Sequence, residues 1–297
     1  MQYIVMDLEW NTAYSTKYGS FFNEVIEIGA AKLDEDFRLV DTISILVRPQ
    51  IGKKLRGRTK DLTHITNEDV LTGKLFTDAL YEFSQWVGDE DNTFLTWGDG
   101  DIRVLSKNNE YFTKSSELKF MKNYADAQKY CQQFLKPKPN QQIGLSAACE
   151  QLGVDIEAFS HHRALDDSLM TVECIKKVFD AEKLKKYTHH CDESFTKRLS
   201  FKPYYIRDIN NPAVKLKGTK CLCDVCGGKA VQKKKWRLVN QSFRSDFYCP
   251  KCKRNFRFSV RYKQFFDYVD IKKTYTEIKP KQKKEAIKSE ALQQISE

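Results

Sequence analysis

The chain has 297 residues, of which 41% are hydrophobic and 12% aromatic, a composition typical of folded globular proteins and unlike that of disordered ones. No apolar run approaches the roughly 20 residues that a membrane-spanning helix needs. The start, MQYIVMDLEW, lacks the basic region and small-residue cleavage site of a secretory signal. We therefore expect a cytoplasmic protein without membrane contact, long enough for two domains.

The charge is divided unevenly along the chain. Residues 1–200 hold 26 Lys and Arg against 31 Asp and Glu, a net charge of −5. Residues 201–297 hold 24 against 9, a net charge of +15, and the two values give the total of +10. A basic segment of this kind is typical of proteins that bind polyanions such as nucleic acid. We expect the two parts to have different roles.

The first part of the chain alternates predicted strands and helices. YIVMDLEW (3–10), EVIEIGAAKLD (24–34) and FRLVDTISILVRP (37–49) read as strands with short turns between them, which predicts an antiparallel start. Apolar residues then recur at helical spacing over 75–88, and a short strand, TFLTWG (93–98), follows. Further helices are predicted over 102–112, 144–154 and 162–184.

This order of elements indicates an α/β domain in which helices flank a mixed sheet. We expect this domain to occupy residues 1–182, with a linker or extension over 183–215. Cysteine pairs and basic aromatic segments then predict a small β-rich module over 216–265. The Lys-rich end, 266–297, has few large apolar residues and is expected to be a disordered basic tail.

Two acidic residues in the first predicted strand suggest a metal site. Asp7 and Glu9 are two positions apart in YIVMDLEW, so their side chains point to the same face of the strand. Two carboxylates so close together repel each other unless a cation lies between them. Carboxylate oxygens are hard ligands, which favours Mg²⁺ or Mn²⁺ over zinc.

Three further residues with catalytic side chains follow at predicted strand and helix ends. Asp101 lies in LTWGDGDIRVL, between a strand and a helix, and His162 and Asp167 lie in HHRALDDSLM, at the start of the last helix. Each has a close competitor of the same type, so the residues alone leave the choice open. The competing positions are Asp99, His161 and Asp166.

The combined pattern DxE, WGDGD and HxAxxD resembles that of the DEDDh, or DnaQ-like, 3′-to-5′ exonucleases, which have an RNase H-like fold. The resemblance covers residues 1–180, and MDLEWN with LTWGDGD is most similar to the exoribonuclease branch related to RNA-interference-enhancing enzymes. It implies two Mg²⁺ or Mn²⁺ ions about 4 Å apart, which activate a water and stabilise the leaving oxygen.

The resemblance also implies a role for each residue. Asp7, Glu9 and Asp167 would hold the metal that carries the attacking water, Asp7 would bridge to the second metal, and Asp101 would help to hold it. The HxAxxD spacing selects His162 and Asp167, and His162 would take the proton from the water, since a pKa near 6.5 leaves it neutral at working pH.

Four residues are candidate substrate contacts. Trp10 and Asn11 directly follow the first two acids and would meet the terminal nucleotide, while Thr63 and Ile65 in THITNEDV would line its pocket. Packing roles for Trp10 and Ile65 are equally compatible with the sequence.

Two CxxC pairs in the second part predict a zinc ribbon. Cys223 with Cys226 and Cys249 with Cys252 supply four thiolates that can converge on one tetrahedral, structural Zn²⁺. Cys221 is a possible alternative ligand. Zinc with four protein ligands has no open position for water and stabilises the fold.

Basic residues in this module are interleaved with aromatic ones, which is typical of single-strand nucleic-acid binding. The alternative is that these aromatic residues form the module's own core. They are Trp236, Phe243, Phe247, Phe256, Phe258 and Tyr262.

Together these features predict a metal-dependent 3′-to-5′ exonuclease that hydrolyses single-stranded RNA to nucleoside 5′-monophosphates, with the zinc ribbon holding the strand. DNA trimming or proofreading is the alternative activity, and a nucleic-acid-binding adaptor with a vestigial nuclease domain is the alternative outside enzymes.

Overall fold

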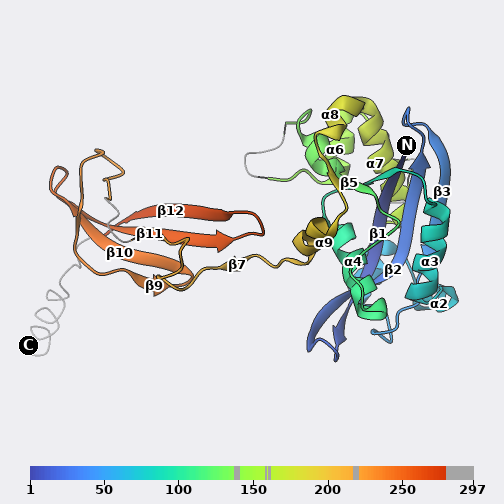
Figure 1. The fold of residues 1–297 in the computed structure, drawn as a ribbon, viewed down its shortest axis with the longest axis horizontal. Coiled ribbons are helices and arrows are strands. Elements are labelled where there is room, and N and C mark those ends of the chain that lie inside the picture. The colour runs from blue at the N-terminus through green and yellow to red at the C-terminus, as the bar shows by residue number, and fades with distance from the viewer. Residues whose placement is uncertain (137–140, 158, 160–161, 217–220, 279–297) are drawn as a thin grey trace, which may run out of the picture. The chain divides into compact units, whose positions relative to one another are not determined.

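The computed structural model describes residues 1–136, 141–157, 159, 162–216 and 221–278 (Figure 1). It divides into two units, with the boundary between Ser200 and Phe201. Among the described residues no helix has the length and apolar character needed to cross a membrane.

The first unit is built on a six-stranded mixed sheet with the order β3-β2-β1-β4-β5-β6. β1, β2 and β3 pair antiparallel, as expected, whereas β4 runs parallel to β1 and β5 parallel to β4. β6 closes the sheet as an antiparallel edge. The strands are β1 (Gln2–Ser15), β2 (Ser20–Leu33), β3 (Leu39–Leu46), β4 (Asn92–Thr96), β5 (Asn123–Asp126) and β6 (Thr188–His190).

Helices cover both faces of this sheet (Figure 1). The described helices are α1 (Gly57–Thr63), α2 (Asn67–Thr72), α3 (Phe76–Val87), α4 (Gly100–Thr113), α5 (Ala127–Gln132), α6 (Leu145–Leu152), α7 (Ala164–Val178), α8 (Ala181–Lys185) and α9 (Glu193–Ser200). This arrangement confirms the expected mixed sheet flanked by helices.

The alternation of β1 decides which face each of its residues serves. Ile4 and Met6 belong to a core with α3 and α4, whereas Tyr3 and Val5 belong to a second core with α5 and α7. Asp7 continues the second set, so the first acid lies on the sheet face that α7 covers. Tyr3 and Val5 are 3% and 0% exposed, so the part of β1 that precedes the acids is held in the core.

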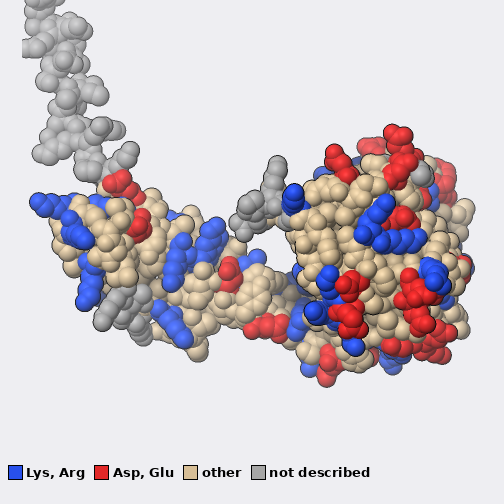
Figure 2. Space-filling model, turned by 90° about the horizontal axis from the view of Figure 1, so that it is seen from above, with Lys and Arg blue, Asp and Glu red and all other residues tan. Residues whose placement is uncertain are grey.

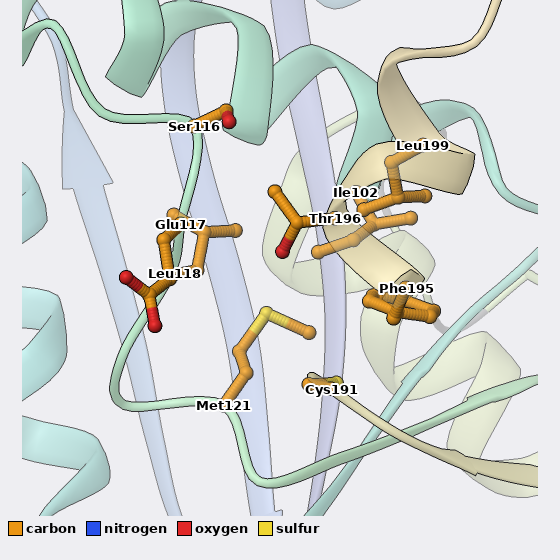
Figure 3. A pocket seen from close by; sticks show the side chains of 9 residues that line it. All are labelled: Ile102, Ser116, Glu117, Leu118, Met121, Cys191, Phe195, Thr196 and Leu199. Atoms are coloured by element: carbon orange, nitrogen blue, oxygen red, sulfur yellow. The ribbon is translucent and has the colours of Figure 1, made fainter. Parts of the chain in front are cut away.

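The first unit extends beyond the expected boundary at residue 182. β6 pairs with β5, and α9 packs Phe195 and Leu199 against Ile102 of α4 and Met121 (Figure 3). The pocket between them is about 10 Å³, room for one water at most, so it is a packing defect rather than a ligand site. The spaced apolar residues of 191–199 are the signal for this packing. Residues 183–200 are therefore part of the first unit and form an extension of the predicted domain.

The second unit is a β-rich sheet with the order β12-β11-β10-β8, to which β7 and β9 add short pairings. The strands are β7 (Tyr204–Tyr205), β8 (Val231–Gln232), β9 (Arg237–Val239), β10 (Ser242–Cys249), β11 (Arg254–Gln264) and β12 (Val269–Glu277). β12 lies in the segment that was expected to be disordered, so that expectation is wrong for residues 269–277. The strand pairs with β11, and Tyr275 stacks on Phe258 with ring centroids 4.7 Å apart. The remainder of that tail, 279–297, lies outside the described residues.

The aromatic residues of the second unit form its core, which corrects the expectation that they offer stacking faces to nucleic acid. Phe256 is fully buried, and the others on β10 and β11 are between 1% and 3% exposed, namely Phe243, Phe247, Phe258 and Tyr262. Trp236 packs edge-on against Phe247 and Phe258. The alternative interpretation of these residues, as a small hydrophobic core, describes them correctly.

Candidate active site

Helix α7 approaches β1 and β2 closely enough to bring its first turn beside the two acids. Gly29 on β2 pairs with Asp7, and a Cβ at this position would lie 2.1 Å from the backbone of Ala164. The Ser168 hydroxyl donates to the Gly29 carbonyl at 3.0 Å, which fixes the helix on the strand. The glycine is needed because no side chain fits between the two backbones.

Asp167 in the first turn of α7 completes a group of three carboxylates. One carboxylate oxygen from each of Asp7, Glu9 and Asp167 lies within 4.8 Å of the others. We call this group the acidic cluster. Asp166, one residue earlier, is not in any metal-ligand group found among the described residues. The structure thus brings together residues from the two ends of the predicted domain, and it selects Asp167 over its neighbour.

Carboxylates of the acidic cluster have raised pKa values, because burial and their mutual repulsion disfavour the charged form. Burial raises the pKa of Asp7 well above its usual value, and the charges of Asp101, Asp167 and Glu9 raise it further. Burial, followed by the charges of Asp167, Glu27 and Asp101, raises the pKa of Glu9 to about 8. Carboxylates in this situation ionise readily only when a cation is close by. The donor set of hard oxygens therefore fits a divalent cation such as Mg²⁺ or Mn²⁺.

Asp101 lies beside the cluster at the start of α4. It is 6% exposed, and its carboxylate accepts a hydrogen bond from the backbone N–H of Leu8. Burial is the main reason why its pKa is raised to about 7, and Asp167 adds to the rise. Asp99, the competing residue, has a side chain that is 47% exposed and pairs with Arg103 at 2.9 Å. The structure thus places Asp101, and not Asp99, next to the cluster.

His162 directly precedes the N-cap residue of α7. It is exposed and has a φ of 63°, a left-handed conformation that is uncommon outside glycine and enriched at functional sites. It is not among the residues that line the cleft described below. His161 lies outside the described residues, so the choice between the two histidines stays a prediction.

Glu27, which sequence reasoning missed, holds the N-terminus of α7. Its side chain is 1% exposed and accepts hydrogen bonds from Arg163 Nη2 at 2.6 Å and from the Ala164 N–H at 3.1 Å. Helix N-termini favour such negative charge. A buried Glu directly opposite Glu9 was visible as the second Glu of EVIEIG, but nothing in the sequence tells a helix anchor from a metal ligand.

A cleft of about 610 Å³ opens over the acidic cluster, within the usual range of ligand sites. All four predicted metal-binding acids line it, namely Asp7, Glu9, Asp101 and Asp167. Trp10 and Thr63, two of the four predicted substrate contacts, also line it, and so do Arg56 and Arg58, which were not predicted. The signal for these arginines was the basic run KKLRGRTK.

Two other predicted substrate contacts lie elsewhere. Asn11 is 1% exposed, and its Oδ1 accepts from the Arg56 N–H at 3.0 Å while its Nδ2 donates to the Lys54 carbonyl at 3.4 Å. It therefore holds the segment that carries the cleft arginines rather than lining the cleft. Ile65 is 2% exposed and packs with Ile26 in a separate core, because the helix-connecting turn points it inward.

The second unit contains the predicted group of four cysteines, Cys223, Cys226, Cys249 and Cys252, whose sulfurs all lie within 4.8 Å of one another. The distances from Cys226 to Cys249 and from Cys223 to Cys252 are 3.5 and 4.0 Å. Two ligands of a tetrahedral Zn–S site are about 3.8 Å apart, from a bond of about 2.3 Å, and a disulfide would need about 2 Å. The group thus fits a zinc ion, and Cys221 is not part of it.

The comparisons with known proteins agree with this geometry. The family model described as "RNase_T: Exonuclease" matches residues 4–175. The chain is 31% identical over 177 residues to the probable 3′-5′ exonuclease KapD of Bacillus subtilis, covering 59% of this chain and 83% of that protein. It is 30% identical over 187 residues to a PolC-type DNA polymerase III of Clostridium perfringens, covering 62% of this chain but 12% of the polymerase.

Solved structures support the fold. The nuclease domain of 3′hExo, a DEDDh family member bound to rAMP, aligns with a TM-score of 0.52 and 23% identity over 62% of this chain and 94% of that one. The cell-death related nuclease 4 (CRN-4) aligns with a TM-score of 0.50 and 17% identity, covering 60% and 63% of the two chains. DEDDh exonucleases use divalent metal ions, for which the acidic cluster provides a suitable site. Since the family model spans more than half of the chain, this protein belongs to the exonuclease family and is a 3′-to-5′ exonuclease.

Proposed function

We propose that this exonuclease acts on single-stranded RNA, uses Mg²⁺ or Mn²⁺ at the acidic cluster, and releases nucleoside 5′-monophosphates. The observation that carries the proposal is the convergence of Asp7, Glu9 and Asp167 within 4.8 Å, in a cleft that arginines also line. Zinc at the four cysteines would stabilise the second unit, which would hold the strand.

The acids supply the negative charge that holds the cations. Asp7, Glu9 and Asp167 would be the ligands of one ion, and Asp7 with Asp101 would hold the second. Divalent cations bound there lower the pKa of an attacking water and neutralise charge on the leaving oxygen. The raised pKa values of Glu9 and Asp101 show how strongly this pocket needs positive charge.

His162 would accept the proton of the attacking water, a step worth roughly 10² to 10⁴ in rate. The Glu27 contacts to Arg163 and Ala164 fix the start of α7, next to His162 and one turn before Asp167. The base and a metal ligand would thus be positioned by the same helix end.

Cleft residues other than the acids would bind the substrate. Arg56 and Arg58 carry the positive charge that pairs with phosphates, and Trp10 adds an aromatic ring to the lining of the cleft. Asn11 supports this role indirectly by holding the Arg56 backbone.

The preference for RNA is supported by the resemblance of MDLEWN and LTWGDGD to the exoribonuclease branch, and two solved relatives were determined with rAMP and with a histone mRNA stem-loop. DNA trimming or proofreading is the second candidate, and the PolC-type relatives favour it.

Competition between matched strands tests the choice. RNA and DNA 20-mers of one sequence, each with a different 5′ label, would be mixed and digested with Mg²⁺, and the products separated by chromatography. Faster loss of RNA with 5′-monophosphate products supports the proposal. Faster loss of DNA would assign the protein to the second candidate.

A further inference from the structure

The sheet of the second unit has two different faces. The buried apolar residues of β10 and β11 all lie on one of them, with Phe256, Phe258, Val260 and Tyr262 alternating along β11. The residues between these, from Arg257 to Lys263, point to the opposite face. That opposite face carries six basic residues, and we call it the basic sheet face: Arg237, Arg244, Arg257, Arg261, Lys263 and Lys272.

Pairing between the strands sets basic residues against one another. Arg261 on β11 is directly opposite Lys272 on β12, and Arg244 on β10 is directly opposite Arg237 on β9. Like charges in directly opposed positions destabilise a sheet. Such pairs are tolerated more easily when an anion lies over both members, so their presence on one face indicates a polyanionic partner.

Acidic residues neutralise only part of this face. Asp246 accepts from Arg257 at 2.8 Å and also pairs with Lys234 at 3.0 Å. Within the described residues no carboxylate forms an ion pair with Arg244, Arg261 or Lys272. On the side of the second unit that Figure 2 shows, blue Lys and Arg side chains outnumber red Asp and Glu side chains.

The aromatic residues on this face do not favour base stacking. The Tyr205 ring already has Arg261 at 5.3 Å and Lys263 at 5.7 Å from its centroid. Tyr248 similarly has Lys233 at 5.3 Å. The chemistry left available is cationic, which suits phosphates and carries no base sequence information.

We propose that the basic sheet face binds the phosphate backbone of single-stranded nucleic acid without base specificity. This inference rests on the proposed function and names the surface of the second unit that would hold the strand. The aromatic core on the other face has a supporting role only.

Binding of a 5′-fluorescein-labelled uridylate 20-mer would be measured by anisotropy between 50 and 200 mM NaCl. All proteins would be full-length and carry Asp7→Asn, so that the probe stays intact. The test variant replaces three residues of the face with glutamine: Arg244, Arg261 and Lys272. Each lost phosphate contact lowers the slope of log K against log salt by about 0.7, so we expect a slope smaller by about 2 and binding at least about ten-fold weaker at 100 mM.

The control variant removes the same charge elsewhere on the second unit, by glutamine at Lys251, Lys253 and Lys273. All three are exposed, and Lys273 neighbours Lys272 but points to the other side of β12. We expect wild-type affinity and slope. Two single variants on the exposed edge strand β12 repeat the comparison with little effect on folding. Lys272→Gln is the test variant, and Lys273→Gln is its control.

Equal weakening by the test and control variants, or no weakening by either, would overturn the inference. Hydrolysis of a dinucleotide by proteins with intact Asp7 is read separately. If the wild type hydrolyses it and the test variant does so equally fast, the binding role stands apart from catalysis. If the wild type hydrolyses neither the dinucleotide nor an RNA 20-mer, the proposed function fails, while the anisotropy result still shows whether the basic sheet face binds the strand.

Discussion

Replacing Glu9 with glutamine is expected to stabilise the metal-free protein at neutral pH while abolishing hydrolysis. Glu9 is held beside Asp7 and Asp167, and its pKa is raised to about 8 from 4.5, mainly by burial and then by Asp167. In the folded metal-free protein it thus binds its proton more tightly than in the unfolded chain. This tighter proton binding adds to the free energy of unfolding. The contribution is complete below pH 4.5 and is lost as the pH rises toward 8.

The size of the effect follows from the two pKa values. One proton changes the free energy of unfolding by at most about 1.4 kcal/mol per pH unit. For Glu9 this gives a loss of about 3 kcal/mol between pH 5 and pH 7.5. The glutamine variant cannot ionise, so its pH dependence should be smaller by that amount. Saturating Mg²⁺ should restore the wild type at pH 7.5, because the cation offsets the repulsion.

Urea unfolding followed by tryptophan fluorescence measures this directly. Three of the four tryptophans, Trp10, Trp86 and Trp97, lie in the first unit and report on it. Dialysis without Mg²⁺ prepares the metal-free protein while sparing a zinc held by four thiolates. Asp99→Asn serves as the control, since that acid is half exposed and outside the cluster. Equal pH dependence for Glu9→Gln and wild type, or no effect of Mg²⁺ on the wild type, would refute the reasoning.

Three further outcomes are expected. Gly29→Ala should lower the free energy of unfolding by about 3 kcal/mol or more and reduce activity, because its Cβ would collide with the α7 backbone, whereas Gly57→Ala, which meets open space, should change neither. Cys249→Ser should lower the zinc content by elemental analysis and unfold the second unit, whereas Cys221→Ser should retain one zinc per chain. His162→Ala should reduce kcat by about 10² to 10⁴ and leave Mn²⁺ affinity, measured calorimetrically, unchanged.

Each of these expectations has a result that contradicts it. Equal stability of the two alanine variants would mean that α7 does not need the close approach at Gly29. Loss of zinc from Cys221→Ser would place that thiol in the site. Unchanged kcat in His162→Ala would exclude this histidine as the general base and leave His161 as the candidate.

The strand that carries the first acids could be predicted well from the sequence. Alternation in YIVMDLEW places Asp7 and Glu9 on one face, and the structure shows both on β1 in the acidic cluster. That prediction needs only local geometry. The meeting with Asp167 depends on the close approach of α7 at Gly29, and no local pattern reveals which glycine permits it.

Residues that act through the tertiary structure were harder to recognise. Glu27 is a strand glutamate like Glu9, which it faces across the sheet. Its carboxylate nevertheless accepts a hydrogen bond from the N-terminus of α7. Asn11 follows the acids directly, yet it supports a neighbouring segment instead of facing the cleft. In both cases the partner is distant in sequence, so the role of the side chain depends on contacts that a local pattern does not contain.

The second unit shows the same limit in a different form. The CxxC spacing alone predicted which four cysteines converge. The alternation of basic and aromatic residues on β11 fitted either a binding surface or a core, and the structure assigns Phe258 to the core and Arg261 to the opposite face. A two-residue period separates two faces without telling which one is covered.

The acidic cluster is proposed to hold the cation required for cleavage. The most direct test is a time course of a 5′-labelled RNA 20-mer with Mg²⁺, comparing wild type with Asp167→Asn, a change that keeps the size of the side chain. We expect a ladder that shortens from the 3′ end in the wild type and intact RNA in the variant. A ladder of equal rate in both would contradict the assignment of the metal site.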